Sequence, residues 1–457
     1  MTLEALLDPE STARRLAAGG LSPEAVERQA RRFTRVAEVL RHSGVEAGRS
    51  ARAFFVPGRI EVLGKHTDYA GGSSLTCAVE RGFALIATPG SDAVVHLTGV
   101  DANHTVRFTL SGDLAPRPGH WSNYPMTVAR RVARNFPGSL RGGHLAFGSD
   151  LPRASGMSSS SALVVAFFLA LSALNTLPEH PDYLAHIEHT EDLAHYLGCV
   201  ENGRTFGTLV GDKGVGTFGG SEDHTAILCS EAGTLRRYAY APTRFEQSVP
   251  FPEGNVFAVA SSGVVASKTG AAQARYNRAA LLAAAAADAW RASTGCNDPH
   301  LGAAVAGPGF SRQRMREALQ AGVDSHFSAE DLTRRFDHFY TENHEILPAA
   351  MEAFQTGDLT AFGLLVDRSQ QAAEQLLQNQ VDATIYLARQ ARRLGATASS
   401  AFGAGFGGSV WALVRREEAK PFLAAWSRGY ADAFPQPAAR ASFVVERPGP
   451  AAFQLRG

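Results

Sequence analysis

The sequence predicts a protein of the α+β class, because strand-like and helix-like segments are gathered in different parts of the chain. Short apolar runs separated by turn residues follow one another between residues 60 and 110, which indicates a β-rich region. Helical periodicity dominates from Asp331 to Leu394. With 457 residues, the chain is long enough for about two to four domains.

The composition, 45% hydrophobic and 19% charged, is that of an ordinary soluble globular protein. Lys plus Arg and Asp plus Glu are equal at 44 each, so no overall positive field attracts nucleic acid or an anionic membrane, and we expect neither partner. The N-terminus lacks the pattern of an export signal, and the cysteines lack metal-ligand spacing. We therefore expect a cytoplasmic protein with reduced thiols.

Residues 1–50 are predicted to form a helical N-terminal extension. Its main helix begins after Ser22, a favourable N-cap residue, with Pro23 at the first helical position, and ends before Gly44. Apolar residues recur along it at spacings of three and four, at Val26, Ala30, Phe33, Ala37 and Leu40. This stripe is expected to face a core.

The segment from Val56 to Gly72 is the densest polar cluster in the chain. A short apolar strand, Ile60–Leu63, lies between the turn signals Pro57-Gly58 and Gly71-Gly72. Five side chains of different chemistry occur in or directly after it: Arg59, Lys65, His66, Asp68 and Tyr69. Side chains at the end of one strand converge, so we expect a binding site here rather than an ordinary surface loop.

Four consecutive serines, Ser158–Ser161, stand directly before a long apolar helix. Ser155 and Gly156 precede them. Hydroxyls and free backbone N–H groups therefore crowd at the positive end of a helix dipole, more of them than capping alone requires. This arrangement predicts an anion-binding site at Ser158–Ser161, here called the anion cradle, and a nucleotide triphosphate is the expected ligand. The P-loop spacing is absent.

Two further segments carry acidic residues suited to a site. Histidines at 186, 189 and 195 are predicted to share a helix with several acids, but further ligands for a transition metal are not apparent, and Glu201 at the helix end is the more useful candidate. Glu222 and Asp223 lie in a glycine-rich turn before a strand-like run, Thr225–Leu228, which would hold a carboxylate on positioned backbone.

Glycines are concentrated between Thr397 and Val414. The glycines at 403, 405, 407 and 408 allow close backbone approach to a ligand, and Val410–Val414 follows as a buried strand. A dinucleotide-binding turn competes as an interpretation, but the strand-turn-helix context that it needs is missing.

Taken together, the segments around Arg59, the four serines and these glycines resemble the three signatures of galactokinases, within the GHMP family of small-molecule kinases. The resemblance extends over most of the chain from Phe54 onward. It implies a two-domain α+β GHMP kinase fold with the active site in the interdomain cleft. The domains would be residues 51–250, with the sugar signature and phosphate loop, and residues 251–457, with the glycine-rich signature.

The resemblance also implies an ATP- and Mg²⁺-dependent kinase that phosphorylates the anomeric (C1) hydroxyl of a hexose. Asp223 would be the catalytic base, Arg59 would stabilise the transferring group, and Ser160 and Glu201 would ligate Mg²⁺. The implied sugar contacts are Lys65, His66, Asp68, Gly220 and Tyr276. The implied nucleotide contacts are Trp121, Ser155, Gly156, Met157, Ser158, Ser159, Ser160 and Ser161, with Gly403, Gly405, Gly407 and Gly408 forming the third signature.

Lys65 departs from the family pattern, which has glutamate there. A carboxylate accepts a hydrogen bond from the sugar, whereas an ammonium only donates. Lys65 could instead pair with a substrate carboxylate, so a uronic acid 1-kinase, acting on galacturonate or glucuronate, is an alternative. In another interpretation Lys65 turns away and a different residue serves the sugar.

A non-catalytic sensor that binds ATP and a sugar is an alternative of another class. It would be favoured if Asp223 or Arg59 lay apart from the phosphate cradle. The presence of both residues favours an enzyme.

Overall fold

Two β-sheets organise the chain in the computed structural model, which describes residues 1–152, 156–264, 270–322 and 326–456. The larger sheet has eight strands in the order β12-β1-β2-β5-β3-β4, with β6 paired to β2 and β7 to β6. Its strands are β1 (Arg52–Leu63), β2 (Ser73–Pro89), β3 (Val94–Gly99), β4 (His104–Thr109), β5 (Gly143–Ser149), β6 (Thr234–Tyr240), β7 (Thr243–Pro250) and β12 (Phe453–Leu455). All pairs are antiparallel except β3 with β5.

Strands β1 and β2 are longer than the sequence predicted. Pro57-Gly58, expected to be a turn, lies inside β1, and the register shifts between Pro57 and Arg59, where a bulge absorbs the missing N–H of proline. Likewise β2 is a single long strand, because Gly82 lets it continue alongside Val56 and Pro57. A Cβ at Gly82 would collide with the Val56 carbonyl oxygen, so glycine permits this close approach.

The large sheet is covered on both faces. Along β1, Phe54 and Val56 belong to the main core, whereas Ala53 and Phe55 belong to a second core beneath the N-terminal helices, as the two-residue alternation of a strand requires. Helices α4 (Asn123–Asn135), α5 (Ser159–Asn175), α7 (Thr190–Asn202) and α8 (Glu222–Cys229) lie on the main-core side.

The second core is formed by α1 (Glu4–Leu7), α2 (Pro9–Ala18) and α3 (Pro23–His42). Helix α3 begins as the sequence predicted: the Ser22 side chain accepts a hydrogen bond from the Ala25 N–H, and Pro23 is the first helical residue. Arg28 of α3 forms an ion pair of 2.8 Å with Asp150, which directly follows β5. The N-terminal helices are therefore fixed to the sheet by burial and by charge.

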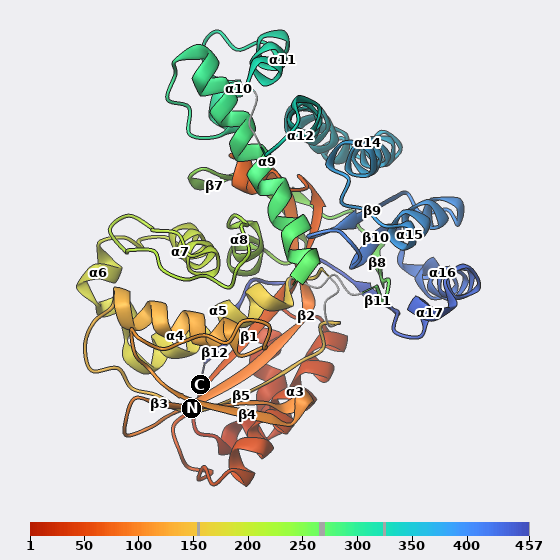
Figure 1. Cartoon of the computed structure of the whole chain (residues 1–457). Helices are drawn as coiled ribbons and strands as arrows, with labels where there is room; N and C mark the ends of the chain where they lie inside the picture. The colour runs from red at the N-terminus through yellow and green to blue at the C-terminus, as the bar shows by residue number, and fades with distance from the viewer. Residues whose placement is uncertain (153–155, 265–269, 323–325, 457) are drawn as a thin grey trace.

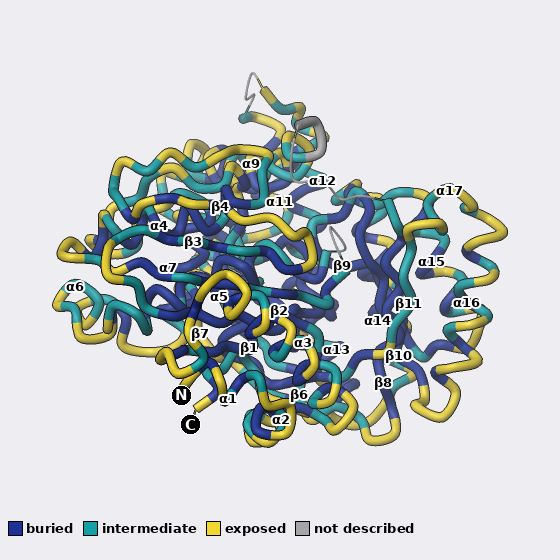
Figure 2. Tube along the Cα trace, turned by 90° about the horizontal axis from the view of Figure 1, so that it is seen from below, coloured by how far each residue is buried: buried dark blue, intermediate teal, exposed yellow. Residues whose placement is uncertain are grey.

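The smaller sheet has the order β11-β8-β10-β9 and is wholly antiparallel. Its strands are β8 (Asn255–Ser261), β9 (Ala398–Phe402), β10 (Ser409–Arg415) and β11 (Ser442–Glu446), and α15 (Asp382–Arg393) and α16 (Ala419–Ala433) pack on it. The chain then returns, so that β12 pairs with β1 and the two termini lie side by side (Figure 1). In Figure 2 strands β1, β2, β8, β9 and β10 are almost wholly buried, whereas β4 and β7 are largely exposed.

A third set of helices packs around its own apolar cluster: α9 (Gly270–Thr294), α10 (Leu301–Ala306), α11 (Arg312–Ala321) and α12 (Ala329–Tyr340). A π-helical segment, Thr341–Ile346, connects α12 to α13 (Leu347–Gln355), and α14 (Leu359–Ala372) follows. The remaining short helices are α6 (Pro181–Leu184) and α17 (Pro435–Ala438).

Two local predictions were wrong. The run Thr225–Leu228 is helical, inside α8, although its β-branched residues favoured a strand; the acids Glu222 and Asp223 occupy the first helical turn, where the helix dipole favours them. The histidine-rich segment is only partly helical, because α7 begins at Thr190, and the His186 ring instead contacts the Thr208 hydroxyl at 2.6 Å.

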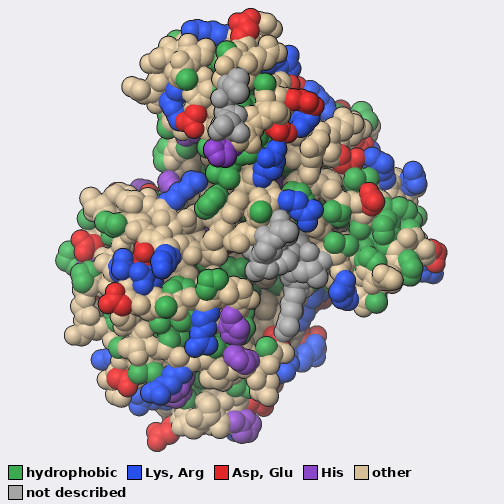
Figure 3. All heavy atoms as spheres, in the orientation of Figure 1, with side chains coloured by type: hydrophobic (Ala, Val, Ile, Leu, Met, Phe, Trp, Pro, Cys, Tyr) green, Lys and Arg blue, Asp and Glu red, His purple; other side chains and the backbone are tan. Residues whose placement is uncertain are grey.

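Charged side chains of both signs are scattered over the face shown in Figure 3, in keeping with the equal totals of acidic and basic residues. Across the described ranges, every helix is too short or too polar to traverse a lipid bilayer.

Candidate active site

A cavity of about 500 Å³ lies between the two sheets. Strand β1, the loop after it and the starts of α5 and α8 line one side, and Tyr276 of α9 and the turn after β9 line the other. The alternation along β1 explains part of this lining: beyond the bulge, Ile60 and Val62 enter the main core, whereas Arg59 and Glu61 line the cavity.

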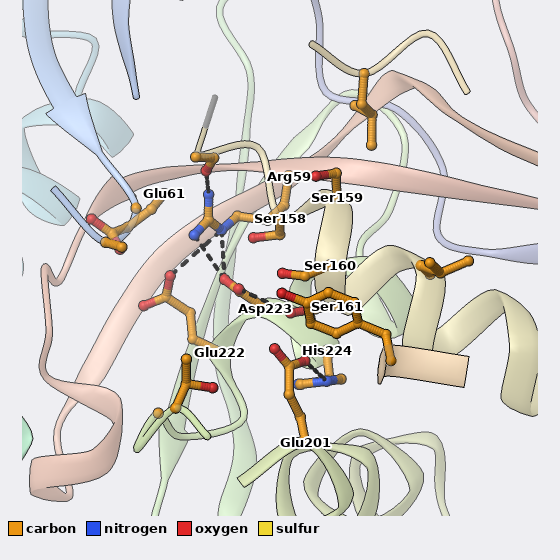
Figure 4. A pocket seen from close by; sticks show the side chains of 18 of the residues that line it. Arg59, Glu61, Ser158, Ser159, Ser160, Ser161, Glu201, Glu222, Asp223 and His224 are labelled. Atoms are coloured by element: carbon orange, nitrogen blue, oxygen red, sulfur yellow. Dashed lines mark hydrogen bonds and ion pairs between the residues drawn. The ribbon is translucent and has the colours of Figure 1, made fainter. Parts of the chain in front are cut away.

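Arg59 and Asp223 form a close ion pair at the centre of the cavity (Figure 4). The Asp223 Oδ1 atom accepts from Arg59 Nε at 2.9 Å and lies 2.7 Å from Nη2, and the guanidinium also donates to the Gly156 carbonyl. Burial alone would lower the pKa of Arg59, but the carboxylates of Asp223, Glu222 and Glu61 raise it. The guanidinium is therefore a permanent cation, and it stabilises the ionised form of the neighbouring carboxyl.

The serine-rich start of α5 faces the same point. Ser158 is the N-cap residue, in the left-handed region at φ 58°, and Ser159–Ser161 form the first helical turn; all four line the cavity. The Ser161 hydroxyl donates to Asp223 Oδ2 at 3.2 Å. Backbone N–H groups at a helix start have no partners within the helix, so this turn can bind an anion beside Asp223.

The opposite end of the cavity is apolar and aromatic. Trp121 and Phe147 are in edge-to-face contact, with ring centroids 5.6 Å apart, and Phe83, Tyr124 and Leu151 line the same region. A flat heteroaromatic ring would bury its faces here, while groups attached to it would extend toward α5.

The loop between β1 and β2 supplies hydroxyl-binding groups. Nε2 of His66 lies 3.2 Å from the Ala404 carbonyl, which can only accept, so Nε2 carries a proton and Nδ1 accepts from the Tyr69 hydroxyl at 2.7 Å. His66 holds this position at φ 55°, an uncommon conformation for a residue other than glycine. Asp68 Oδ2 accepts from the Gly220 N–H at 3.0 Å.

Two further acids line the cavity beside the ion pair. Glu222 Oε1 lies 3.8 Å from Arg59 Nε, and the carboxyl of Glu61 lies near enough to that of Glu222 to affect its pKa. Burial raises the pKa of both groups, and nearby carboxylates raise that of Glu222 further. Two buried carboxyl groups so close together disfavour each other's ionisation.

Comparison of the sequence with protein families identifies the family of this chain. The galactokinase galactose-binding signature matches residues 45–89, the GHMP kinase N-terminal domain matches residues 123–205, and the GHMP kinase C-terminal domain matches residues 350–432. The chain belongs to the GHMP kinase family.

Whole-length relatives place this GHMP kinase among galactokinase-like proteins. It is 29% identical to the galactokinase of Chloroflexus aggregans, over 86% of this chain and 90% of that protein. It is 25% identical to the galactokinase of Glaesserella parasuis, over 81% and 86%. The solved structure of Lactococcus lactis galactokinase complexed with galactose has the same fold, with a TM-score of 0.73 at 23% identity, over 91% of this chain and 98% of that one. The two-domain GHMP kinase fold predicted from sequence is confirmed, while the boundaries at residues 50 and 250 stay a prediction.

The donors expected to hold Mg²⁺ in this GHMP kinase fit that ion. Ser160 and Glu201 both line the cavity, and Glu201 Oε2 lies 3.0 Å from His224 Nε2. In the described part of the chain, no three His, Cys, Asp or Glu residues are grouped to hold a metal by themselves. A hydroxyl and a carboxylate, completed by phosphate oxygens and water, are the oxygen ligands that Mg²⁺ takes in nucleotide sites.

Most of the predicted site residues of the kinase lie together. Those that line the cavity are Arg59, His66, Asp68, Trp121, Gly156, Ser158, Ser159, Ser160, Ser161, Glu201, Gly220, Asp223, Tyr276 and Gly403. Ser155 lies outside the described residues. Met157 does not line the cavity: its side chain is buried in the main core, and its carbonyl accepts from the Arg59 N–H at 3.3 Å.

The third signature also needs a correction. Gly403, at φ 79°, packs against Gly156, so the two glycine turns meet directly. Gly405, Gly407 and Gly408 do not line the cavity. A Cβ at Gly405 would collide with the Asn379 carbonyl oxygen, and a Cβ at Gly407 would lie 2.6 Å from the Val264 carbonyl oxygen. These glycines shape the turn that presents Gly403 and Ala404.

Lys65 is not placed to contact a sugar. Its side chain is 1% exposed and outside the cavity lining, and Nζ donates to the Ser369 hydroxyl at 2.8 Å. That hydroxyl donates in turn to Glu342 Oε1 at 2.9 Å. The expectation that Lys65 meets a substrate carboxylate is therefore wrong for this structure, and the ammonium instead offsets a buried carboxylate.

Residues far along the chain hold the loop between β1 and β2, and sequence patterns did not reveal them. Glu342 Oε1 accepts from the Gly64 N–H at 2.8 Å, Asn343 Oδ1 accepts from the Ser73 N–H at 2.7 Å, and Arg335 donates to the His66 carbonyl at 2.6 Å. Glu342 and Asn343 belong to the π-helical segment, a feature often found near functional sites.

Proposed function

We propose that this galactokinase-like protein transfers the terminal phosphoryl group of ATP to the anomeric (C1) hydroxyl of a hexose. The observation that carries the proposal is the Arg59–Asp223 ion pair at the serine-rich start of α5, which unites a base, a cation and an anion cradle in one cavity. The relatives are named galactokinases, which supports a hexose as acceptor.

Phosphoryl transfer needs alignment and charge neutralisation more than a strong nucleophile. Oδ2 of Asp223, the oxygen that does not contact Arg59, would accept the proton of the sugar hydroxyl. Arg59 would stabilise charge on the transferring group. The first turn of α5 would bind the phosphates, and the adenine ring would occupy the aromatic end near Trp121. Mg²⁺ held by Ser160 and Glu201 would supply further neutralisation of the phosphates.

Two alternatives are less well supported. A uronic acid would bring a carboxylate into a cavity that already contains Glu61, Asp68, Glu222 and Asp223, and Lys65 is not there to meet it. A sensor without activity would not require Asp223 in contact with both Arg59 and Ser161.

The test is ATP consumption by the purified protein with neutral hexoses, hexosamines and uronates, followed by NMR of each product to locate the phosphate. The proposal expects a sugar 1-phosphate from at least one hexose or hexosamine, and little turnover of uronates. Phosphate on any carbon other than C1, or ATP binding without turnover of any sugar, would contradict it.

A further inference from the structure

The sugar side of the cavity has an excess of buried carboxyl groups. Glu61, Asp68, Glu222 and Asp223 line it together with one guanidinium, that of Arg59. Lys65 lies near enough to lower the pKa of Glu61 somewhat against the effect of burial, but its ammonium is bonded to Ser369 outside the cavity.

Two of the four carboxyls have clear partners. Asp223 is paired with Arg59, and Asp68 accepts from the Gly220 N–H. The ion pair of Glu222 with Arg59 is long, at 3.8 Å. Glu61 is 3% exposed, and its Oε1 atom has no hydrogen-bond partner although it belongs to a cavity-lining side chain.

A buried carboxyl without a full set of partners costs free energy, and two such groups close together disfavour each other's ionisation unless a cation lies between them. Two carboxyl oxygens are enough to bind an ammonium group. The ammonium carries the positive charge that offsets the carboxylates, and it can donate three hydrogen bonds.

We propose that the preferred acceptor is an amino sugar whose ammonium group binds between Glu61 and Glu222. This inference rests on the proposed sugar 1-kinase activity. Glu222 adjoins the base Asp223, and both carboxyls share the Arg59 guanidinium, so the ammonium lies near the reacting carbon. The first compounds to test are therefore 2-amino-2-deoxyhexoses, in which the amino group is on the carbon next to C1.

The decisive measurement is kcat/KM of the wild-type protein for galactosamine, glucosamine and mannosamine against the neutral sugar in which a hydroxyl replaces each amino group. N-acetylated forms serve as uncharged controls. The proposal expects at least one amino sugar to exceed its neutral counterpart by about 10-fold or more, the ratio that a charged hydrogen bond supplies.

Glu61→Gln and Glu222→Gln keep the side-chain shape and remove the charge, so each is expected to lower that ratio by about 10-fold. Glu446→Gln is the matched control, because Glu446 is an equally buried glutamate, 3% exposed, on β11 and outside the cavity. It is expected to leave the ratio unchanged. Thermal unfolding and ATP binding establish that each variant is folded. The ratio measured with the wild-type protein tests the proposal even if a variant does not fold.

The possible outcomes separate the two proposals. Preference for a neutral hexose, with C1 phosphorylation, overturns the amino-sugar inference and leaves the kinase activity standing. Absence of any sugar 1-phosphate overturns both. Saturable binding of Mg²⁺ or Mn²⁺ without nucleotide, lost in Glu61→Gln, would assign the acid pair to a metal and also overturn the inference.

Discussion

The Nη2 atom of Arg335 donates a hydrogen bond of 2.6 Å to the backbone carbonyl of His66, across 269 residues of sequence. The same guanidinium lies over the Tyr69 ring, 5.6 Å from its centroid, and donates to the Ala279 carbonyl at 3.1 Å. Arg335 therefore fixes the loop that presents His66 to the cavity, although it does not line the cavity itself.

Arg335→Gln is expected to raise KM for the sugar by about 10-fold or more, because a misplaced binding group weakens substrate positioning. KM for ATP should stay within about two-fold of wild type, since the phosphate cradle is on α5. Steady-state kinetics with each substrate varied in turn will measure both. Arg316→Gln is the control, because Arg316 of α11 pairs with Asp337 of α12 and does not line the cavity. Equal rises in both KM values would indicate general loss of structure.

Asp223→Asn is expected to lower kcat by at least about 100-fold, because an amide cannot accept the proton of the attacking hydroxyl. The amide oxygen can still accept from Arg59, and the amide NH2 group can donate to the Ser161 hydroxyl oxygen, so the cavity should keep its shape. ATP affinity, measured by calorimetry, is expected to change little. A variant with wild-type kcat would remove Asp223 from the role of base.

The sequence alone was sufficient for those parts of the site that are coded locally. Ser22 and Pro23 predicted the start of α3, and the serine run predicted the start of α5, because capping and helix-start chemistry depend on neighbouring residues. Arg59 lies in a buried strand, and a charged residue in an apolar strand indicates a functional site. The same signal at Glu61, two residues on, could have revealed the acid pair.

Features that depend on packing between distant segments were not predictable in this way. The direction of the Lys65 side chain is decided by Ser369 and Glu342, about which the local sequence carries no information. The helical state of Thr225–Leu228 is likewise decided by burial of α8 against the main core, which overrides the strand preference of its β-branched residues.

Lys65→Met is expected to lower the free energy of unfolding by about 3 kcal/mol, because it leaves the buried Glu342 carboxylate without its nearby cation. The order in which sugars are preferred should not change, since Lys65 lies outside the cavity lining. Urea unfolding and the sugar panel test the two statements separately. A shift of preference toward or away from uronates would restore Lys65 as a substrate contact.

Glu446 is expected to make stability depend on pH. Burial raises its pKa to about 7 from an ordinary value of 4.5, despite an ion pair of 2.5 Å with Arg81. Between these pH values the folded protein holds a proton that the unfolded chain has lost, so this group makes the free energy of unfolding fall as pH rises from 4.5 to 7. Urea unfolding of wild type and Glu446→Gln at several pH values should show the wild type losing stability relative to the variant across that window. Parallel curves would contradict the assignment.

The contact between the two glycine turns gives a prediction for nucleotide binding. A Cβ at Gly403 would lie 2.8 Å from the Gly156 carbonyl oxygen, which also accepts from Arg59, so Gly403→Ala should displace the cradle as well as strain a backbone at φ 79°. Gly395→Ala is the matched control, because Gly395 has φ 97° and nothing within 4 Å of an added Cβ.

Both variants should therefore lose about 1 kcal/mol of stability from the positive φ, whereas only Gly403→Ala should raise KM for ATP, by about 10-fold. Chemical unfolding measures the shared loss, and initial rates at varied ATP measure the difference. If Gly395→Ala raised KM for ATP equally, the effect would reflect stability alone, and the contact between Gly403 and Gly156 would have no part in holding the phosphate cradle.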